Sequence, residues 1–316
     1  MKAKRGARST GRANVVRRHA GSLLLFPGAL GDAVCLEPAL AELAASGPVT
    51  LYARGGAAEV ARLFPARPKV RSLDAPEIAR LFSPLADHEN DHAAADQGDW
   101  LAGFARIVSF TGAGVPALVA RLTATGRAMV APFPRAPLGM HASDYFLRTV
   151  SGVDGAIAVA PRLLPPPRSP SEPADCAGSL VLLPGSGGSA KRAPRDLFAD
   201  LAGRWRGRGG QVVVVLGPAE EGEGLAWQGC GRICRPASIA DLAGALDGAA
   251  AFAGNDSGPS HVAAALGVPG VVFFTVTTAA DFGPRGRAVV PIGLGDRLLD
   301  GSALDAAWLV LDPQLP

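Results

Sequence analysis

Short apolar runs alternate along the chain with longer amphipathic stretches. Such runs are typical of strands that are buried on both faces of a parallel sheet. They predict strands at 22–26, 49–53, 70–73, 106–110 and 128–131 in the first half and at 180–183, 212–216, 249–253 and 271–274 in the second. Helices are predicted at 33–45, 57–64, 116–125, 141–150, 195–206, 220–228, 238–246 and 262–266. This alternation indicates βαβ units and an α/β fold.

A proline-rich segment divides the chain almost in half. Residues 161–173 contain six prolines, which excludes a regular helix or strand there. We take 161–177 as a linker between an N-terminal domain, 21–160, and a C-terminal domain, 178–316. Each half opens with a strand that runs into a glycine-rich loop. The pattern therefore predicts two Rossmann-like, doubly wound domains that face each other across a cleft.

Basic residues are concentrated at the N-terminus. Seven lie within residues 1–19 with no acidic residue among them, which leaves 24 basic against 28 acidic side chains in the rest. We expect residues 1–20 to be a disordered arm, either solvated or attracted to anionic lipid at the inner membrane surface. The acidic remainder argues against nucleic acid as a partner. The first apolar run, 23–26, is too short for a signal peptide or a membrane span, so a cytoplasmic protein is expected.

Cysteine and histidine spacing favours no metal site. Cys230 and Cys234 form the closest cysteine pair and are one residue further apart than a zinc or redox motif requires. His88 and His92 lie among acidic residues, a pattern more typical of a solvated helix or loop. No metal or other cofactor is therefore expected.

The stretch 254–260 carries the strongest indication of a ligand site. It is a polar turn between a predicted buried strand and a predicted helix, the place where open α/β sheets bind ligands. Amide groups at a helix start suit an anion such as a diphosphate. Asp256, Ser257 and Ser260 are also good N-cap residues, so an ordinary capped helix is the alternative.

The second glycine-rich loop, 184–191, fits several motifs only in part. Residues 185–190 match G-x-G-x-x-A of dinucleotide-binding proteins, but Pro194 delays the helix and the expected acidic residue is missing. The P-loop pattern fails around Lys191, and no serine has the flanking glycines of a nucleophile elbow. Phosphate binding without a classical nucleotide motif remains, with Lys191 and Arg192 supplying charge.

The segment GNDSGPSHVAAALGVPGVVFF at 254–274 closely resembles the C-terminal motif of glycosyltransferase family 9, the heptosyltransferases of lipopolysaccharide biosynthesis. LLPGSGGSAK at 182–191, VVVVLGPAEE at 212–221 and PGALGDAVCLEPAL at 27–40 are similar to the family in the same order. The resemblance implies a GT-B fold and an inverting, metal-independent transfer from ADP-heptose, bound by the C-terminal half, to a lipid-linked or surface-glycan acceptor.

Residue roles follow from the same resemblance. Asp32 would be the general base, in an acceptor-side loop with Gly28 and Gly31. Lys191 would hold a donor phosphate, and Glu221 or its neighbour Glu220 would bind the ribose. The remaining donor-binding residues implied are Ser186, Asp256, Ser257, Gly258, His261 and Thr277.

Each role has a structural alternative. Asp32 could be only the N-cap of its helix, Lys191 a solvated loop lysine and Glu221 a first-turn acid. His261 could be packed within its helix. The chain also departs from the family at Ala193, where Trp is usual, and at Thr275, where Gly is common. A non-catalytic nucleotide-binding relative and an NAD-dependent oxidoreductase are therefore the competing functions.

Overall fold

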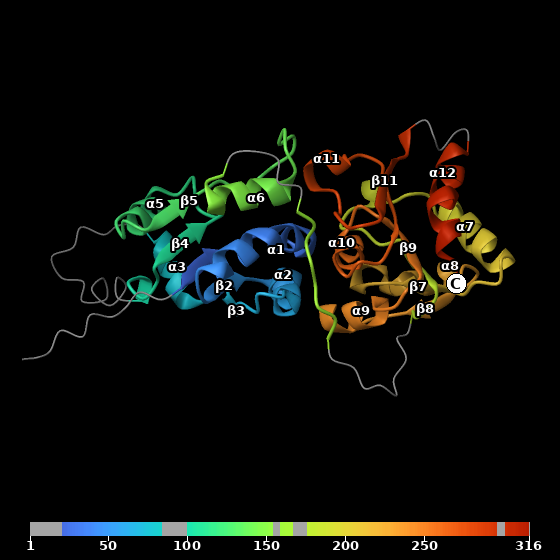
Figure 1. The fold of residues 1–316 in the computed structure, drawn as a ribbon, viewed down its shortest axis with the longest axis horizontal. Helices are drawn as coiled ribbons and strands as arrows, with labels where there is room; N and C mark the ends of the chain where they lie inside the picture. The colour runs from blue at the N-terminus through green and yellow to red at the C-terminus, as the bar shows by residue number, and fades with distance from the viewer. Residues whose placement is uncertain (1–20, 84–99, 154–158, 167–175, 296–300, 316) are drawn as a thin grey trace, which may run out of the picture.

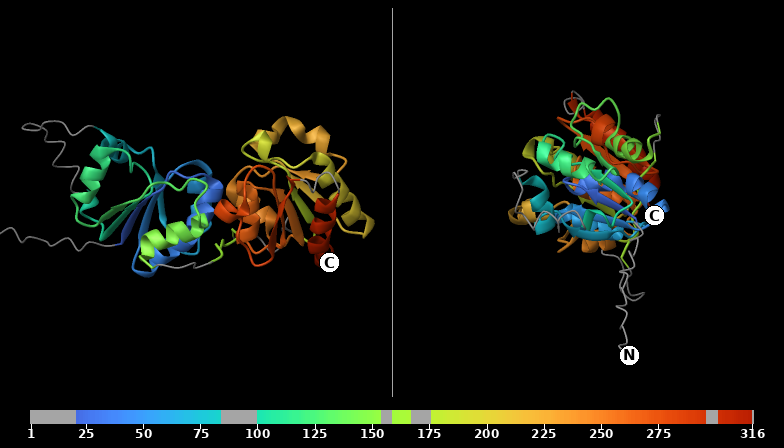
Figure 2. Two further views of the ribbon diagram at one scale, coloured as in Figure 1. Left: turned by 90° about the horizontal axis from the view of Figure 1, so that it is seen from above. Right: turned by 90° about the vertical axis from the view of Figure 1, so that its left-hand side faces the viewer.

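A computed structural model describes residues 21–83, 100–153, 159–166, 176–295 and 301–315. The described residues form two α/β halves, each built on one parallel sheet and lying side by side (Figure 1). Figure 2 shows the two sheets from above, each flanked by its own helices. The basic arm and the His88 and His92 segment lie outside the described residues.

The N-terminal half contains a five-stranded sheet in the order β3-β2-β1-β4-β5, parallel throughout. Parallel neighbours need crossover connections, and helices supply them. The first three strands are added towards one edge of the sheet and the last two towards the other, so the strand order reverses between β1 and β4. The elements are β1 (Ser22–Leu25), α1 (Leu30–Ala45), β2 (Val49–Ala53), α2 (Gly55–Val60), η1 (Ala61–Leu63), β3 (Lys69–Ser72), α3 (Pro76–Phe82), β4 (Arg106–Ser109), α5 (Pro116–Thr123), β5 (Ala128–Val130) and α6 (Ala142–Ser151).

The C-terminal half contains a six-stranded sheet in the order β11-β10-β9-β6-β7-β8, also parallel. Its strand order reverses between β6 and β9, which opens a crevice at their carboxyl ends. The elements are β6 (Leu180–Leu183), η2 (Ser189–Lys191), α7 (Arg195–Gly207), β7 (Val212–Val215), η3 (Pro218–Glu223), α8 (Gly224–Trp227), β8 (Arg232–Cys234), α9 (Ile239–Leu246), β9 (Ala251–Asn255), α10 (Gly258–Ala265), β10 (Gly270–Phe274), α11 (Ala279–Phe282), β11 (Val289–Gly293), α12 (Ser302–Leu311) and η5 (Asp312–Gln314).

The nine predicted strands are present, and several boundaries differ from the predictions. Helix α1 begins at Leu30 rather than at residue 33, and α10 begins at Gly258 rather than at 262. The predicted helix at 220–228 is instead a 3-10 turn followed by the short α8, because Glu220 has non-helical backbone angles. Strand β9 runs on to Asn255, so only Asp256 and Ser257 separate it from α10.

Among the described residues, the helices α3, α11 and α12 and the strands β8 and β11 were not predicted. Strand β11 lies at the edge of its sheet, and most of its residues are not buried. It also contains Pro291, which cannot donate to a neighbouring strand. A strand of this kind lacks the apolar run that marks β6 or β7.

The two halves pack directly against each other. Helix α1 contacts α10, and a single buried apolar cluster includes both Val34 and Val262. The carboxylate of Asp144 in α6 accepts two hydrogen bonds from Arg285, at 2.7 and 2.8 Å. Glu59 in α2 accepts a hydrogen bond from Ile239 N at the start of α9. These contacts fix the relative position of the two sheets.

The described part of the proline-rich segment, 161–166, contains no helix or strand. It is nevertheless anchored to both halves. Leu163 N donates to Ala265 O, Leu164 N donates to Leu63 O, and Arg162 N donates to Glu37 Oε2. Residues 167–175 of this linker lie outside the described residues.

Candidate functional site

Two adjoining pockets occupy the crevice where the strand ends of both halves meet. One, called here the polar pocket, has a volume of about 770 Å³ and reaches from the start of α1 to the start of α10. The other, the apolar pocket, has a volume of about 400 Å³ and lies mainly in the C-terminal half near β7 and α9, with α1 and α2 at its edge. Gly187, Ser257 and Gly258 line both pockets. The two therefore form one continuous site with a polar and an apolar end.

The polar pocket brings together most of the residues singled out in the sequence. Both halves contribute, although the motifs are more than 150 residues apart in the chain. The predicted residues that line it are Gly31, Asp32, Lys191, Asp256, Ser257, Gly258, His261 and Thr277. Gly28 does not line it; a Cβ at this position would lie 2.7 Å from Asp32 Cβ, so Gly28 packs behind the aspartate.

Lys191 is held in an ion pair at the edge of this pocket. Its Nζ donates to Asp256 Oδ2 at 2.9 Å, and Thr277 Oγ1 donates to the same oxygen at 2.8 Å. The Asp256 side chain is 8% exposed, whereas that of Lys191 is 39% exposed. Lys191 is thus not a freely solvated loop lysine. It presents a fixed cation to the pocket, next to the start of α10.

Asp32 occupies the third position of α1, and Ala29 is the N-cap. The expectation that Asp32 could be the N-cap is therefore wrong, because the helix begins earlier than its apolar pattern suggests. Asp32 Oδ2 accepts a hydrogen bond from Ala29 N at 2.8 Å. Burial raises the pKa of this carboxyl, and the Ala29 amide and the Lys191 charge only partly oppose that shift. The carboxylate remains available to the pocket through its second oxygen.

His261 is buried in α10 and also lines the polar pocket. Its Nδ1 lies 3.8 Å from Cys35 Sγ in α1, and its ring packs on Gly31, where a Cβ would lie 2.9 Å from Cδ2. Burial lowers the pKa of His261 to about 4, against the charge of Asp256, and raises that of Cys35 to about 12. The imidazole and the thiol are therefore both neutral at physiological pH.

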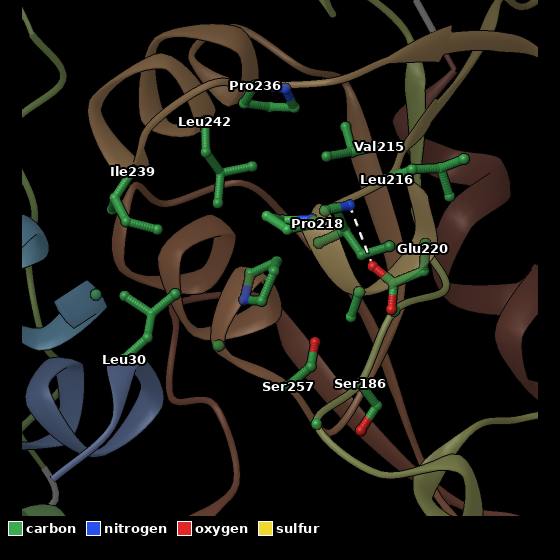
Figure 3. Close-up of a pocket in the computed structure, with 18 of the residues that line it drawn as sticks. Leu30, Ser186, Val215, Leu216, Pro218, Glu220, Pro236, Ile239, Leu242 and Ser257 are labelled. Atoms are coloured by element: carbon green, nitrogen blue, oxygen red, sulfur yellow. Dashed lines mark hydrogen bonds between the residues drawn. The ribbon is translucent and has the colours of Figure 1, made fainter. Parts of the chain in front are cut away.

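The apolar pocket is lined mainly by aliphatic side chains and prolines from the C-terminal half, and the N-terminal half contributes Leu30 from α1 and Gly56 and Glu59 from α2 (Figure 3). Its labelled apolar residues are Leu30, Val215, Leu216, Pro218, Pro236, Ile239 and Leu242. Glu220, Ser186 and Ser257 supply side-chain oxygens. This combination suits a flat heteroaromatic ring joined to a hydroxyl-bearing group.

Of the two adjacent glutamates, Glu220 and not Glu221 lines this pocket, together with Glu59 from α2. Pro218 starts the 3-10 turn, and Glu220 at the third position turns back to accept a hydrogen bond from Gly217 N at 3.1 Å. Its side chain is 5% exposed, while Glu221 is exposed and lines neither pocket. The available signal was Gly217 followed by Pro218 and, three positions after the glycine, Glu220, because a glutamate at the third helical position commonly accepts from the N-cap amide.

Arg192 does not meet the expectation of a phosphate-binding charge. Its two terminal nitrogens donate to Glu220 Oε1 at 2.8 Å and to Glu223 Oε1 at 2.6 Å. It lines neither pocket. Of the two adjacent cations, Lys191 faces the polar pocket, and Arg192 braces the carboxylate of the apolar one.

Asn255 was missed in the sequence, although it directly precedes the polar turn. It is fully buried, its Nδ2 donates to Pro184 O at 2.7 Å, and its Oδ1 accepts from Ala193 N at 2.9 Å. It thereby holds both ends of the glycine-rich loop. Thr275 Oγ1 adds a hydrogen bond to Ala190 O in the same loop, so this departure from the family pattern fastens the loop to the end of β10.

No cluster of three or more histidine, cysteine or acidic side chains suited to a metal ion occurs within the described ranges. All four cysteines are buried, and none of them forms a disulfide bond. In the same part of the chain, every helix is too short or too polar to cross a bilayer.

The C-terminal half of the chain is similar to known glycosyltransferases. Residues 169–298 match the family model for glycosyltransferase family 9 (heptosyltransferase). A segment of 118 residues is 34% identical to lipopolysaccharide heptosyltransferase 1 of Pseudomonas aeruginosa, covering 36% of this chain and 33% of that protein. The match thus spans about a third of the curated relative's length.

Solved structures share the fold over nearly the whole chain. A family 9 glycosyl transferase from Veillonella parvula has a TM-score of 0.68 at 14% identity, covering 94% of this chain and 97% of the other. The E. coli heptosyltransferase WaaC with ADP has a TM-score of 0.66 at 17% identity, covering 93% and 99%. The two Rossmann-like domains thus form a GT-B fold. Residues 169–298 thus carry a domain similar to that of glycosyltransferase family 9 (heptosyltransferase), and the fold of the chain is similar to that of solved members of this family.

Proposed function

We propose that the protein transfers heptose from ADP-heptose to a lipopolysaccharide-core or other surface-glycan acceptor, with inversion and without a metal ion. The observation that carries the proposal is the polar pocket, where Asp32 from one half lines the same cavity as Lys191 and Asp256 from the other. A base and an anion-binding group on opposite walls are what transfer from a nucleotide-diphospho-sugar requires.

The donor would occupy both pockets. The adenine ring fits the apolar pocket, and the Glu220 carboxylate accepts hydrogen bonds from the ribose hydroxyls. The diphosphate lies where the pockets join, next to Lys191 and the N-terminus of α10. Ser257, the N-cap of α10, makes no side-chain capping bond, so the Gly258 amide at the start of this helix remains for an anion, while Pro259 has no N–H to donate. The bound ADP named for the E. coli relative supports this choice of base.

In the proposed reaction, Asp32 accepts the proton of an acceptor hydroxyl. The hydroxyl oxygen forms a bond to the anomeric carbon as the bond from that carbon to the diphosphate oxygen breaks, on the opposite face. ADP leaves with the electron pair, and the growing charge is met by Lys191 and the start of α10. A raised pKa makes Asp32 a stronger base than an ordinary aspartate. A lipid-linked acceptor would bring the protein to the inner surface of the membrane.

The first experiment is a calorimetric titration of the full chain with ADP, UDP, GDP and NAD. We expect ADP to bind best. A preference for UDP or GDP would change the donor, and NAD binding alone would contradict a glycosyltransferase. A ligand at 100 times its Kd should also stabilise the fold by about 2.7 kcal/mol.

The second experiment measures heptose transfer from ADP-heptose in the presence of EDTA. We expect transfer by the parent protein and a loss of at least about 100-fold in kcat for Asp32→Asn, with ADP affinity unchanged. Parent protein that binds ADP but transfers no sugar to any glycan acceptor would identify a non-catalytic relative. Loss of transfer in EDTA, with recovery on adding a divalent cation, would contradict metal independence.

A further inference from the structure

Arg192 is a cation beside the nucleotide site that the proposed reaction does not use. Its Nη2 donates to Glu220 Oε1 at 2.8 Å, and its Nη1 donates to Glu223 Oε1 at 2.6 Å. Glu223 Oε2 in turn accepts from Trp227 Nε1 at 3.4 Å. The guanidinium therefore bridges two carboxylates, and Trp227 supports the outer one.

The inner carboxylate, that of Glu220, is held on several sides. Its Oε1 accepts from Arg192 and its Oε2 from the Gly217 amide. A Cβ at position 185 would lie 2.8 Å from the carboxylate carbon, so Gly185 allows the chain to pass directly against it. With only 5% of the side chain exposed, this carboxylate has little freedom to turn.

The hydrogen bonds leave acceptor capacity toward the pocket. An ionised carboxylate offers about four lone-pair sites, and here two are taken by Arg192 and Gly217. Each oxygen thus keeps room for one further donor. Two adjacent oxygens that only accept are complementary to a vicinal diol, and they disfavour a phosphate in its place because like charges repel.

We propose that Arg192 is a positioning residue that holds Glu220 for the 2′,3′-diol of the donor ribose. Together the pair selects nucleotides with an unmodified ribose. This inference rests on the proposed function, because it requires a nucleotide in the apolar pocket. It assigns different tasks to adjacent cations: Lys191 acts on the diphosphate, and Arg192 acts on the ribose through Glu220.

The variants that test this are Arg192→Met, which removes the guanidinium, and Arg192→Lys, which keeps a charge without the fork. Removing one partner of a nearly buried pair leaves Glu220 with the Gly217 amide alone. The matched control is Arg204→Met, which breaks an arginine–carboxylate contact of 2.9 Å to Asp305 on the surface, away from both pockets. Thermal melting shows whether each variant is folded.

The probes are adenosine, ADP, 2′-deoxy-ADP and 3′-deoxy-ADP, titrated calorimetrically into the full chain. We expect Arg192→Met to weaken the binding of adenosine and of ADP by the same factor, about tenfold, which corresponds to about 1.4 kcal/mol of binding free energy. One of the two deoxy nucleotides should bind the parent protein more weakly because it lacks the hydroxyl that contacts Glu220. Arg192→Met should reduce the affinity for that nucleotide by much less than tenfold. Arg192→Lys should fall between Arg192→Met and the parent, and Arg204→Met should match the parent.

Two outcomes would overturn the inference while the proposed function stands. Unchanged adenosine binding with weaker ADP binding would make Arg192 a phosphate ligand. Equal weakening of ADP and both deoxy nucleotides would show a general structural role. A parent protein that prefers UDP or GDP is tested with the matching nucleoside and deoxy nucleotides. Failure of the parent to bind any of these nucleotides would overturn the proposed function and, with it, the inference.

Discussion

Lys191 Nζ donates to Asp256 Oδ2 at 2.9 Å, and this contact joins the glycine-rich loop after β6 to the turn after β9. The two strands are neighbours in the sheet, so the pair spans the point where the strand order reverses. Thr277 donates to the same carboxylate oxygen. An anion that enters the polar pocket meets a lysine whose position is already set by a nearly buried partner.

Replacing Lys191 with methionine should weaken ADP binding by about 10- to 100-fold, because hydrogen bonds to charged groups contribute about 1.5–3 kcal/mol. Adenosine binding should change little, since the lysine lies at the polar end of the site. Calorimetric titration measures both affinities. Lys69→Met, on the exposed edge strand β3, is the control. Equal ADP affinity in the parent and in Lys191→Met would show that Lys191 does not contribute to donor binding.

Asp32→Asn should raise the stability of the fold at neutral pH while abolishing transfer. Burial raises the folded-state pKa of Asp32 above 3.8. Protonated Asp32 therefore favours the folded state, and this contribution to the free energy of unfolding is complete below pH 3.8 and is lost as the pH rises through the folded-state pKa. At pH 7.5 the parent therefore holds an unfavourable charge that asparagine lacks. Melting temperatures at pH 7.5 and pH 4 test this. The advantage of the variant should shrink at pH 4, and a variant less stable at both pH values would contradict the argument.

Acid should destabilise the protein through His261. Its pKa is lowered from 6.5 to about 4 by burial, so between these values the unfolded chain binds a proton that the folded chain does not. Stability should fall as pH drops from 6.5 towards 4. His141, whose pKa burial also lowers, acts in the same direction. Urea denaturation at pH 7 and pH 5 should show a smaller loss for His261→Gln than for the parent. Equal losses of unfolding free energy in the parent and in His261→Gln would show that other groups cause the acid sensitivity.

Gly31→Ala should cost about 1–3 kcal/mol of stability and should impair transfer. The added Cβ would lie 2.9 Å from His261 Cδ2, and the buried ring has little room to move. The matched control is Gly203→Ala in α7, where a Cβ meets no atom within 4 Å. That substitution should stabilise the exposed helix by up to about 1 kcal/mol. A Gly31→Ala protein as stable and active as the parent would show that the two helices separate easily.

Local sequence patterns determined the arrangement of the two sheets. The buried runs of β1, β6 and β7 are apolar because both faces are covered, and each glycine-rich loop follows such a strand. This was enough to predict two Rossmann-like halves, whereas ligand binding at the turn after β9 stays a prediction. Edge strand β11 was not predicted because its exposure removes the apolar run. Helix α1 starts earlier than its apolar pattern, with the Asp32 side chain accepting a hydrogen bond from the Ala29 amide at its N-cap.

Only the tertiary structure decided which side chains meet. Glu220 and Glu221 are equivalent in the sequence, yet the 3-10 turn buries one in the pocket and leaves the other exposed. Arg192 and Lys191 are adjacent cations, and their partners come from different connections of the sheet. Cys35 and His261 lie 226 positions apart and meet because α1 packs on α10. Local patterns arise from each element's own burial, whereas these pairings depend on how distant elements pack, which no local pattern encodes.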